Sequence, residues 1–312
     1  MTISPTVRLL ALACLLALPP NVPAAGQTAP VGEAGHPAPS GAVKLWVLAT
    51  DAHRKLVLDL NAEDFQVFEN NRQQRITSFS PRAPEPLALG LLIETSRSRL
   101  YEPDPADWRP YSQMLHKLLR PGDRALVTTF AEEVATPLAR FTSDLGQLDS
   151  ALQQTFSAPP KGTTGLYDAI CALSEERFAG EPGRKALLVV SDSPDDYSFH
   201  NRLQTLERVR RAGVTVFSLL PWVDREGQPA FGAVQAAQLF AAETGGLLFL
   251  AFNRRMLAKD IDGIRIALTY SYAIEYTPSD IPRDGKYHAV RVKCVRHGVR
   301  LYTSQGYYAP DS

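Results

Sequence analysis

The sequence predicts a doubly wound, mainly parallel α/β domain, together with a small β domain built from segments before and after it. Two observations lead to this fold class. In the middle of the chain, short apolar runs alternate with helical patterns, which is typical of a parallel sheet covered by helices. Toward both ends of the chain, shorter strand-like segments occur without helices between them.

The composition is that of a packed globular protein with room for about two domains. The chain has 312 residues, of which 45% are hydrophobic and 21% are charged. Lys plus Arg and Asp plus Glu each number 33, so the formal net charge is zero. A balanced charge does not favour a nucleic-acid-binding protein or a polybasic membrane-surface protein. We therefore expect no nucleic acid among the partners.

The first segment has the features of a secretory signal peptide. Arg8 precedes an apolar run from Leu9 to Leu18, which is much shorter than the roughly 20 residues of a membrane-spanning helix. Two prolines and several small residues follow, as at a cleavage site. We expect residues 1–24 to be cleaved and the protein to be secreted or periplasmic, with no membrane span in the mature chain. A buried helix, a retained anchor and lipidation at Cys14 are the alternatives.

A linker and a first group of strands are expected next. Residues 25–41 consist largely of Gly, Pro, Ala and Ser, a composition typical of linkers. Residues 42–84 are expected to form the first part of the β domain. Asn70 and Asn71 lie between two of its strands, and Asn tolerates the positive φ of a tight hairpin. The expected strands are Val43–Leu48, Lys55–Leu58, Phe65–Phe68 and Arg75–Phe79.

Residues 85–268 are expected to form the α/β domain. Its apolar runs are too continuous for strands with one exposed face, so these strands are expected to be buried on both faces. They are Leu87–Ile93, Ala125–Phe130, Ala186–Val190, Val214–Leu220 and Leu247–Phe252. Helical patterns lie between or after them, at Trp108–Leu119, Leu145–Phe156, Leu166–Phe178, Arg202–Arg211, Val234–Glu243 and Met256–Ala267.

Strand patterns return in residues 269–312, the expected second part of the β domain. In the segment Tyr287–Val295, side chains alternate with a period of two, which predicts a sheet with one buried face. The other expected strands are Tyr270–Tyr276 and Val299–Tyr302. Neither terminal segment alone makes a convincing core, so we expect the two to pack together with the α/β domain inserted between them.

Carboxylates and hydroxyls gather at the predicted carboxyl ends of the parallel strands. Glu94, Ser96 and Ser98 follow the first strand, Thr164 precedes the third helix, and Asp192 follows the third strand. In a doubly wound sheet these ends meet at one edge, where ligands bind. Oxygen ligands suit a hard divalent cation such as Mg²⁺. The sequence therefore predicts a cation site at this edge.

Three other acidic residues lie close by in the sequence. Asp195 and Asp196 are interpreted as part of a solvated loop that begins a helix, a position that Asp favours. Asp168 lies in the first turn of a predicted helix, where it either supports the cation indirectly or interacts with the helix dipole.

At the predicted cation site the sequence resembles the von Willebrand factor A domain. The metal-ion-dependent adhesion site of that family is written Asp-x-Ser-x-Ser, followed by a distant Thr and a distant Asp. Ser96 and Ser98 match the two serines, Thr164 the threonine and Asp192 the second aspartate. Glu94 stands where the family has its first aspartate.

The flanking segments are similar to those of the bacterial exported VWFA-related domain family. The segment Leu60–Asn70 resembles the stretch that precedes the A domain in that family, and residues 276–279, 284–287 and 306–308 resemble the stretch that follows it. The resemblance covers nearly all of residues 42–309 and implies a sheet of von Willebrand factor A type.

The resemblance implies an exported protein-binding module that acts in adhesion or as a scaffold. Mg²⁺, or else Mn²⁺ or Ca²⁺, would be held by the five matched residues, and an acidic side chain of a partner protein would complete the metal shell. Glu94 is one methylene longer than the aspartate of the family. It therefore either contacts the cation directly, or acts as a strained substitute, or leaves a metal-free scaffold with a degenerate site.

An enzyme is the remaining alternative, as a metal-dependent hydrolase that uses Asp192. No Gly-x-Ser-x-Gly, His-Glu-x-x-His or Gly-x-x-x-x-Gly-Lys motif occurs in the sequence. We therefore expect no catalytic residues and no enzymatic activity.

Overall fold

The computed structural model describes residues 41–97, 108–135, 137–221, 230–251, 253–279 and 283–311. These ranges lie within one unit of the chain, residues 34–312. The expected signal peptide, residues 1–24, lies outside the described residues, as do most of the linker and Ser98. In the described ranges, no helix combines the length and the apolar character needed to cross a bilayer.

A mainly parallel sheet forms the centre of the α/β domain. Its strands are β5 (Leu87–Glu94), β6 (Arg124–Phe130), β7 (Val134–Ala135), β8 (Arg184–Val190), β9 (Val214–Pro221) and β10 (Leu248–Ala251). The strand order is β10-β9-β8-β5-β6-β7, and every neighbouring pair is parallel except β6 and β7. All residues of β5 and β8 are buried, as the continuous apolar runs predicted.

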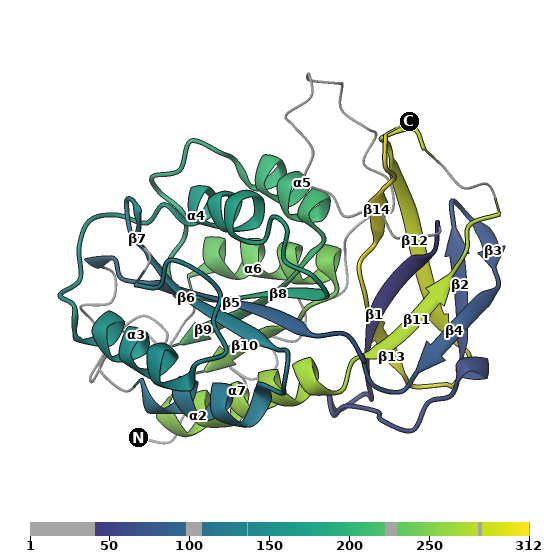
Figure 1. The fold of residues 1–312 in the computed structure, drawn as a ribbon, viewed down its shortest axis with the longest axis horizontal. Helices are drawn as coiled ribbons and strands as arrows, with labels where there is room; N and C mark the ends of the chain where they lie inside the picture. The colour runs from purple at the N-terminus through teal and green to yellow at the C-terminus, as the bar shows by residue number, and fades with distance from the viewer. Residues whose placement is uncertain are drawn as a thin grey trace. The chain divides into compact units, whose positions relative to one another are not determined.

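Helices cover both faces of this sheet (Figure 1). They are α2 (Arg109–Leu118), α3 (Leu145–Ser157), α4 (Leu166–Ala172), α5 (Arg202–Ala212), α6 (Phe231–Thr244) and α7 (Arg254–Thr269). Leu89, Leu91 and Ile93 of β5 pack in one core with α2, α3 and α7, whereas Ala88 and Leu92 pack in the other with α4, α5 and α6. Side chains of a strand alternate between its faces, so these two cores confirm the doubly wound α/β fold.

Two antiparallel sheets form the β domain. The strands before the α/β domain are β1 (Val43–Thr50), β2 (Phe65–Glu69), β3 (Arg72–Gln74) and β4 (Ile76–Ser80), and those after it are β11 (Tyr272–Tyr276), β12 (Tyr287–Cys294), β13 (Arg300–Tyr302) and β14 (Gly306–Tyr308). The sheet orders are β13-β1-β11-β4 and β14-β12-β2-β3, so each sheet contains strands from both terminal segments. Val47, Val67, Ile274 and Val290, from four different strands, share one core. A small β domain built from segments before and after the α/β domain is thus confirmed, while its boundaries at residues 84–85 and 268–269 stay predictions.

The prediction of a strand at Lys55–Leu58 is wrong. The Asp51 carboxylate accepts hydrogen bonds from two backbone N–H groups of the following turn, in which Arg54 has a φ of 62°. Only an isolated bridge, from Thr50 to Leu56, forms where a strand pairing was expected. Asp often competes with sheet pairing in this way, because its short side chain reaches nearby backbone donors.

Candidate functional site

The candidate site lies at the point where the direction of the strand connections reverses. β5 is the first strand of the sheet in the chain and β8 the fourth, yet they are neighbours. Connections from two such strands leave toward opposite faces, and ligands of doubly wound sheets bind in the crevice that this creates. Glu94 is the last residue of β5, and Ser191 and Asp192 follow directly after β8.

Three hydroxyl groups donate hydrogen bonds to the Glu94 carboxylate. Ser96 Oγ and Thr164 Oγ1 lie 2.5 and 2.9 Å from Glu94 Oε1, and Ser191 Oγ lies 2.6 Å from Glu94 Oε2. All four residues are buried, and Glu94 is only 2% exposed. The structure therefore brings together three of the five predicted site residues around one carboxylate and adds Ser191, which the sequence analysis missed.

The hydroxyl groups of Ser96 and Thr164 retain the capacity to bind a cation. A hydroxyl has one proton to donate and two lone pairs that accept, so a hydroxyl that donates to Glu94 still has its lone pairs. Oxygen atoms of this kind, together with carboxylates and water, are what Mg²⁺ and Mn²⁺ prefer. The donor set thus fits a hard divalent cation.

Asp192 is the more exposed carboxylate of the site. Its residue is half-buried, and Ser193 Oγ donates to its Oδ1 over 2.9 Å. Nowhere in the described ranges do three or more His, Cys, Asp or Glu side chains form a cluster that could hold a metal ion. A cation at this site would therefore depend on hydroxyls, water and an oxygen from a partner in addition to the two carboxylates.

The loop that carries Thr164 is fixed by hydrogen bonds from the loop after β8. The Thr164 N–H donates to Asp196 Oδ1 over 2.7 Å, and the N–H groups of Asp196 and Tyr197 donate to the Thr164 carbonyl oxygen. Asp195 Oδ2 accepts from the N–H of Tyr167, in the first turn of α4. Asp196 is exposed, as expected of a solvated loop, but neither aspartate begins a helix, because α5 starts at Arg202 with Asn201 as its N-cap. Asp195 instead satisfies a backbone donor in the first turn of α4, and Asp196 satisfies that of Thr164 just before this helix.

Two glycines allow the same loop to approach the end of β6. A Cβ at Gly162, which has a φ of 62°, would lie 2.7 Å from the Glu132 carboxyl group. A Cβ at Gly165 would lie 3.0 Å from the carbonyl oxygen of Ala131. Because larger residues would push the loop outward, glycine keeps Thr164 within reach of Glu94.

Asp168 organises the next loop of the site edge. Although partial burial opposes its ionisation, the N–H groups of Phe199 and His200 and the imidazole of His200 hold the pKa of Asp168 below its usual value. The two N–H donors lie 2.9 and 3.0 Å from its oxygens. Asp168 lies in the first turn of α4, as one of its two expected roles requires, and its carboxylate also fixes the backbone that precedes α5.

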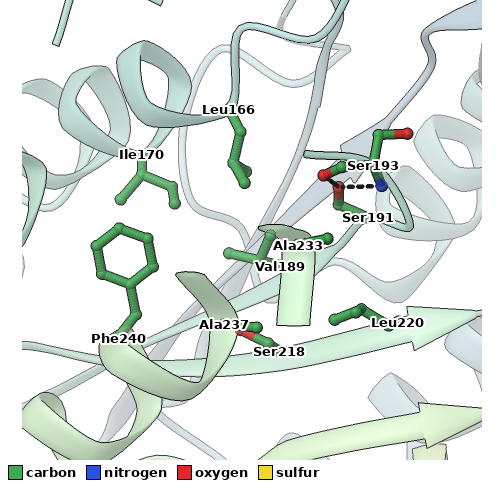
Figure 2. Close-up of a pocket in the computed structure, with 10 residues that line it drawn as sticks. All are labelled: Leu166, Ile170, Val189, Ser191, Ser193, Ser218, Leu220, Ala233, Ala237 and Phe240. Carbon is green, nitrogen blue, oxygen red and sulfur yellow. Dashed lines mark hydrogen bonds between the residues drawn. The ribbon is translucent and has the colours of Figure 1, made fainter. Parts of the chain in front are cut away.

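A small pocket lies beside Ser191 and Ser193. Figure 2 shows these two serines on one side and the apolar side chains of Leu166, Ile170 and Phe240 on the other. The space open to the centres of water-sized molecules is about 10 Å³. That is about the minimum for one water molecule, so this pocket cannot admit a larger ligand in its present form. A larger ligand would bind across the surface of the site edge.

Comparison with known proteins supports the fold. No protein-family model matches the chain, and no curated protein does. Proximal thread matrix protein 1 from the mussel byssus, in a structure with a zinc-occupied MIDAS motif, is 13% identical at a TM-score of 0.51, over 64% of this chain and 49% of that one. A von Willebrand factor type A structure from Catenulispora acidiphila is 12% identical at a TM-score of 0.50, over 79% of this chain and 76% of that one.

These similarities confirm at the level of fold the resemblance to the von Willebrand factor A domain. The α/β domain has the von Willebrand factor A-type fold, and its strand order and connections agree with that assignment. The chain spans about half the length of the mussel protein. The metal of that structure belongs to that protein, and a metal at Glu94 and its neighbours stays a prediction for this one.

Proposed function

We propose that the edge of the sheet around Glu94 is a protein-binding surface at which a divalent cation joins this chain to an acidic side chain of its partner. The observation that supports this most directly is the geometry of Ser96 and Thr164, whose hydroxyls converge on one oxygen of Glu94 and so gather the kind of oxygen atoms that a hard cation prefers. Asp192 supplies a second carboxylate, and Ser98 is proposed as a further ligand. The ion, when bound, supplies open coordination positions for the carboxylate of the partner.

Exposed apolar side chains in the loop after β8 and at the start of α5 are suited to a protein partner. Phe199 is 94% exposed, Leu203 65% and Tyr197 50%. Exposed aromatic side chains held in a fixed loop lose little entropy on binding and often dominate protein interfaces. We infer that the partner is a protein met after export through the signal peptide at residues 1–24, and that the chain binds without catalysing a reaction.

A metal-free scaffold is the second candidate function, and one observation favours it. The Glu94 carboxylate already accepts three hydroxyl hydrogen bonds and is almost fully buried, so the arrangement does not require a cation for its stability. In that case the partner would bind through the exposed side chains alone.

Thermal unfolding in the presence of metal distinguishes the two candidates. The protein is first treated with a chelator and then unfolded in millimolar Mg²⁺, Mn²⁺ or Ca²⁺. A ligand that binds only the folded state stabilises it by about 2.7 kcal/mol at one hundred times its Kd, so the cation site predicts a rise of several degrees in the thermal midpoint. Asp192→Ala should abolish the rise, because a hard cation loses a charged ligand.

The control removes a carboxylate elsewhere. Asp262 lies on α7 with a side chain that is 51% exposed, and Asp262→Ala should respond to metal as the wild type does. No response of the wild-type protein to millimolar metal would exclude the cation site and leave the metal-free scaffold.

A further inference from the structure

The two oxygens of the Glu94 carboxylate have separate partners. Oε1 accepts from Ser96 and Thr164, which are both predicted site residues. Oε2 accepts from Ser191, at the end of the neighbouring strand and 97 residues away in the sequence. The Glu94 side chain therefore spans the gap between the ends of β5 and β8 and orients one oxygen toward each set of donors.

Ser191 is itself held in place from two sides. Its backbone N–H donates to the carbonyl oxygen of Leu219 in β9 over 3.2 Å, which continues the pairing of β8 beyond its last residue. Its hydroxyl oxygen lies 3.4 Å from the N–H of Ser193, as Figure 2 shows. Ser193 in turn donates its side-chain hydroxyl to Asp192. A continuous series of hydrogen bonds thus links Glu94 through Ser191 and Ser193 to the second carboxylate.

The length of the Glu94 side chain is what allows this contact. An aspartate is shorter by one carbon–carbon bond, about 1.5 Å. With an unmoved backbone the carboxylate would withdraw from its donors, and the 2.6 Å separation from Ser191 Oγ would lengthen to as much as about 4 Å, which is beyond hydrogen-bond range. If the shorter side chain instead shifts to keep Ser96 and Thr164 on one oxygen, it can no longer span the gap to Ser191. Ser191 is only 5% exposed, so its hydroxyl would then keep only one long contact, to the carbonyl oxygen of Ser193 at 3.5 Å, in a mostly apolar setting.

We propose that Ser191 is a positioning residue that matches the glutamate at position 94, so that the two side chains act as a pair. This inference rests on the proposed cation site for the measurement with metal described below, but not for the measurement of stability in chelator. The departure from aspartate is then compensated within the structure, and Glu94 is neither a strained substitute nor a sign that the site has degenerated. Glu94→Asp should weaken the site instead of restoring it.

A double-mutant cycle in chelator tests the pair without any metal. The four proteins are the wild type, Glu94→Asp, Ser191→Ala and the double variant. Each single variant should lower the thermal midpoint by about 2–4 °C, because each removes the same hydrogen bond. The double variant should lower the midpoint by little more than one single variant does.

A second serine provides a control without a hydrogen bond to Glu94. Ser174 is 1% exposed and its hydroxyl has no hydrogen-bond partner among the described residues, so Ser174→Ala removes a buried hydroxyl alone. Its effect should add to that of Glu94→Asp. If Ser191→Ala adds to Glu94→Asp in the same way, the two side chains do not act as a pair and the proposal is overturned.

The rise in thermal midpoint with metal distinguishes a positioning role of Ser191 at the site from a role in core packing alone. The rise in midpoint with Mn²⁺ should shrink in both Glu94→Asp and Ser191→Ala, and Ser191→Thr, which keeps the hydroxyl, should restore it. A larger rise in Glu94→Asp than in the wild type would overturn the proposal. Non-additive stabilities without a metal response in any of the proteins would support the pair and reject the cation function, so the two failures are distinguishable.

Discussion

Two buried glutamates, one in each domain, have similar local chemistry and different surroundings. Glu94 ends β5 of the parallel sheet, and Glu69 ends β2 of the β domain. They are 2% and 5% exposed, and the hydroxyls of Ser96, Thr164 and Ser191 donate to Glu94. Glu69 also has three polar side chains beside it. The groups that face Glu69 are the hydroxyls of Tyr276 and Tyr307, at 2.8 and 3.2 Å, and Nδ1 of His288 at 3.4 Å.

The difference lies in where the partners are carried. All three partners of Glu69 are large side chains on strands, whose positions are set by sheet register. Burial, followed by contact with the Glu69 carboxylate, raises the pKa of Tyr276 and of Tyr307, so both phenols remain protonated donors. The partners of Glu94 are small hydroxyls on residues that follow strands or precede a helix. Partners on strands close a carboxylate into a core, whereas the small partners of Glu94 gather oxygen atoms at the edge of a sheet.

The largest expected effect comes from a truncation that removes Tyr276, His288 and Tyr307 beside Glu69 but keeps the three hydroxyls that donate to Glu94. A chain that ends at residue 269 lacks β11, β12, β13 and β14. Hydrogen exchange should show lost protection in β1 and β2, because both pair with the missing strands. Protection in β5 and β8 should persist. Equal loss of protection in both domains would contradict the idea that the surroundings of the two glutamates are independent. Full protection of β1 and β2 would show that the segment before the α/β domain is stable alone.

A smaller but still large effect is expected from removing the Glu69 carboxylate. Glu69→Ala leaves the buried phenol of Tyr276 and the half-buried phenol of Tyr307 without their acceptor, so the free energy of unfolding should fall by about 3 kcal/mol. Glu69→Gln keeps an acceptor of nearly the same shape and should cost about half as much. Urea unfolding measures both. Equal losses in the two variants would show that the carboxylate contributes through its volume and not through its hydrogen bonds.

The smallest effect concerns one hydroxyl from each cluster. Thr164→Val and Tyr307→Phe each remove a single donor from a glutamate that keeps two other partners. In chelator, each should lower the free energy of unfolding by about 1 kcal/mol. Only Thr164→Val should reduce the rise in thermal midpoint with Mn²⁺. A reduced metal response in Tyr307→Phe would mean that the comparison between the two glutamates does not hold.

Local patterns in the sequence predicted most of the secondary structure correctly. The parallel strands, the helices and the tight turn at Asn70 and Asn71, with φ values of 48° and 67°, agree with the expectations. The turn joins β2 to β3, however, and the strand expected at 75–79 pairs in the other sheet as β4. β3, β7 and β14 were missed, because two or three residues are too few for a periodic pattern. The helix expected at 166–178 has two parts, since α4 ends at Ala172 and a π-helical turn follows at Leu173–Arg177.

The sequence by itself determined the fold class and the edge of the sheet at which the candidate site lies. Apolar periodicity is a local property, and the ends of parallel strands meet wherever such strands form a sheet. The contact between Glu94 and Ser191, the use of Asp195 and Asp196 to hold another loop, and the cluster around Glu69 were decided only by the tertiary structure. Each depends on which strands become neighbours. Each also depends on distances between side chains far apart in the sequence, where a difference of a few tenths of an ångström decides whether a hydrogen bond forms, and no local pattern contains that information.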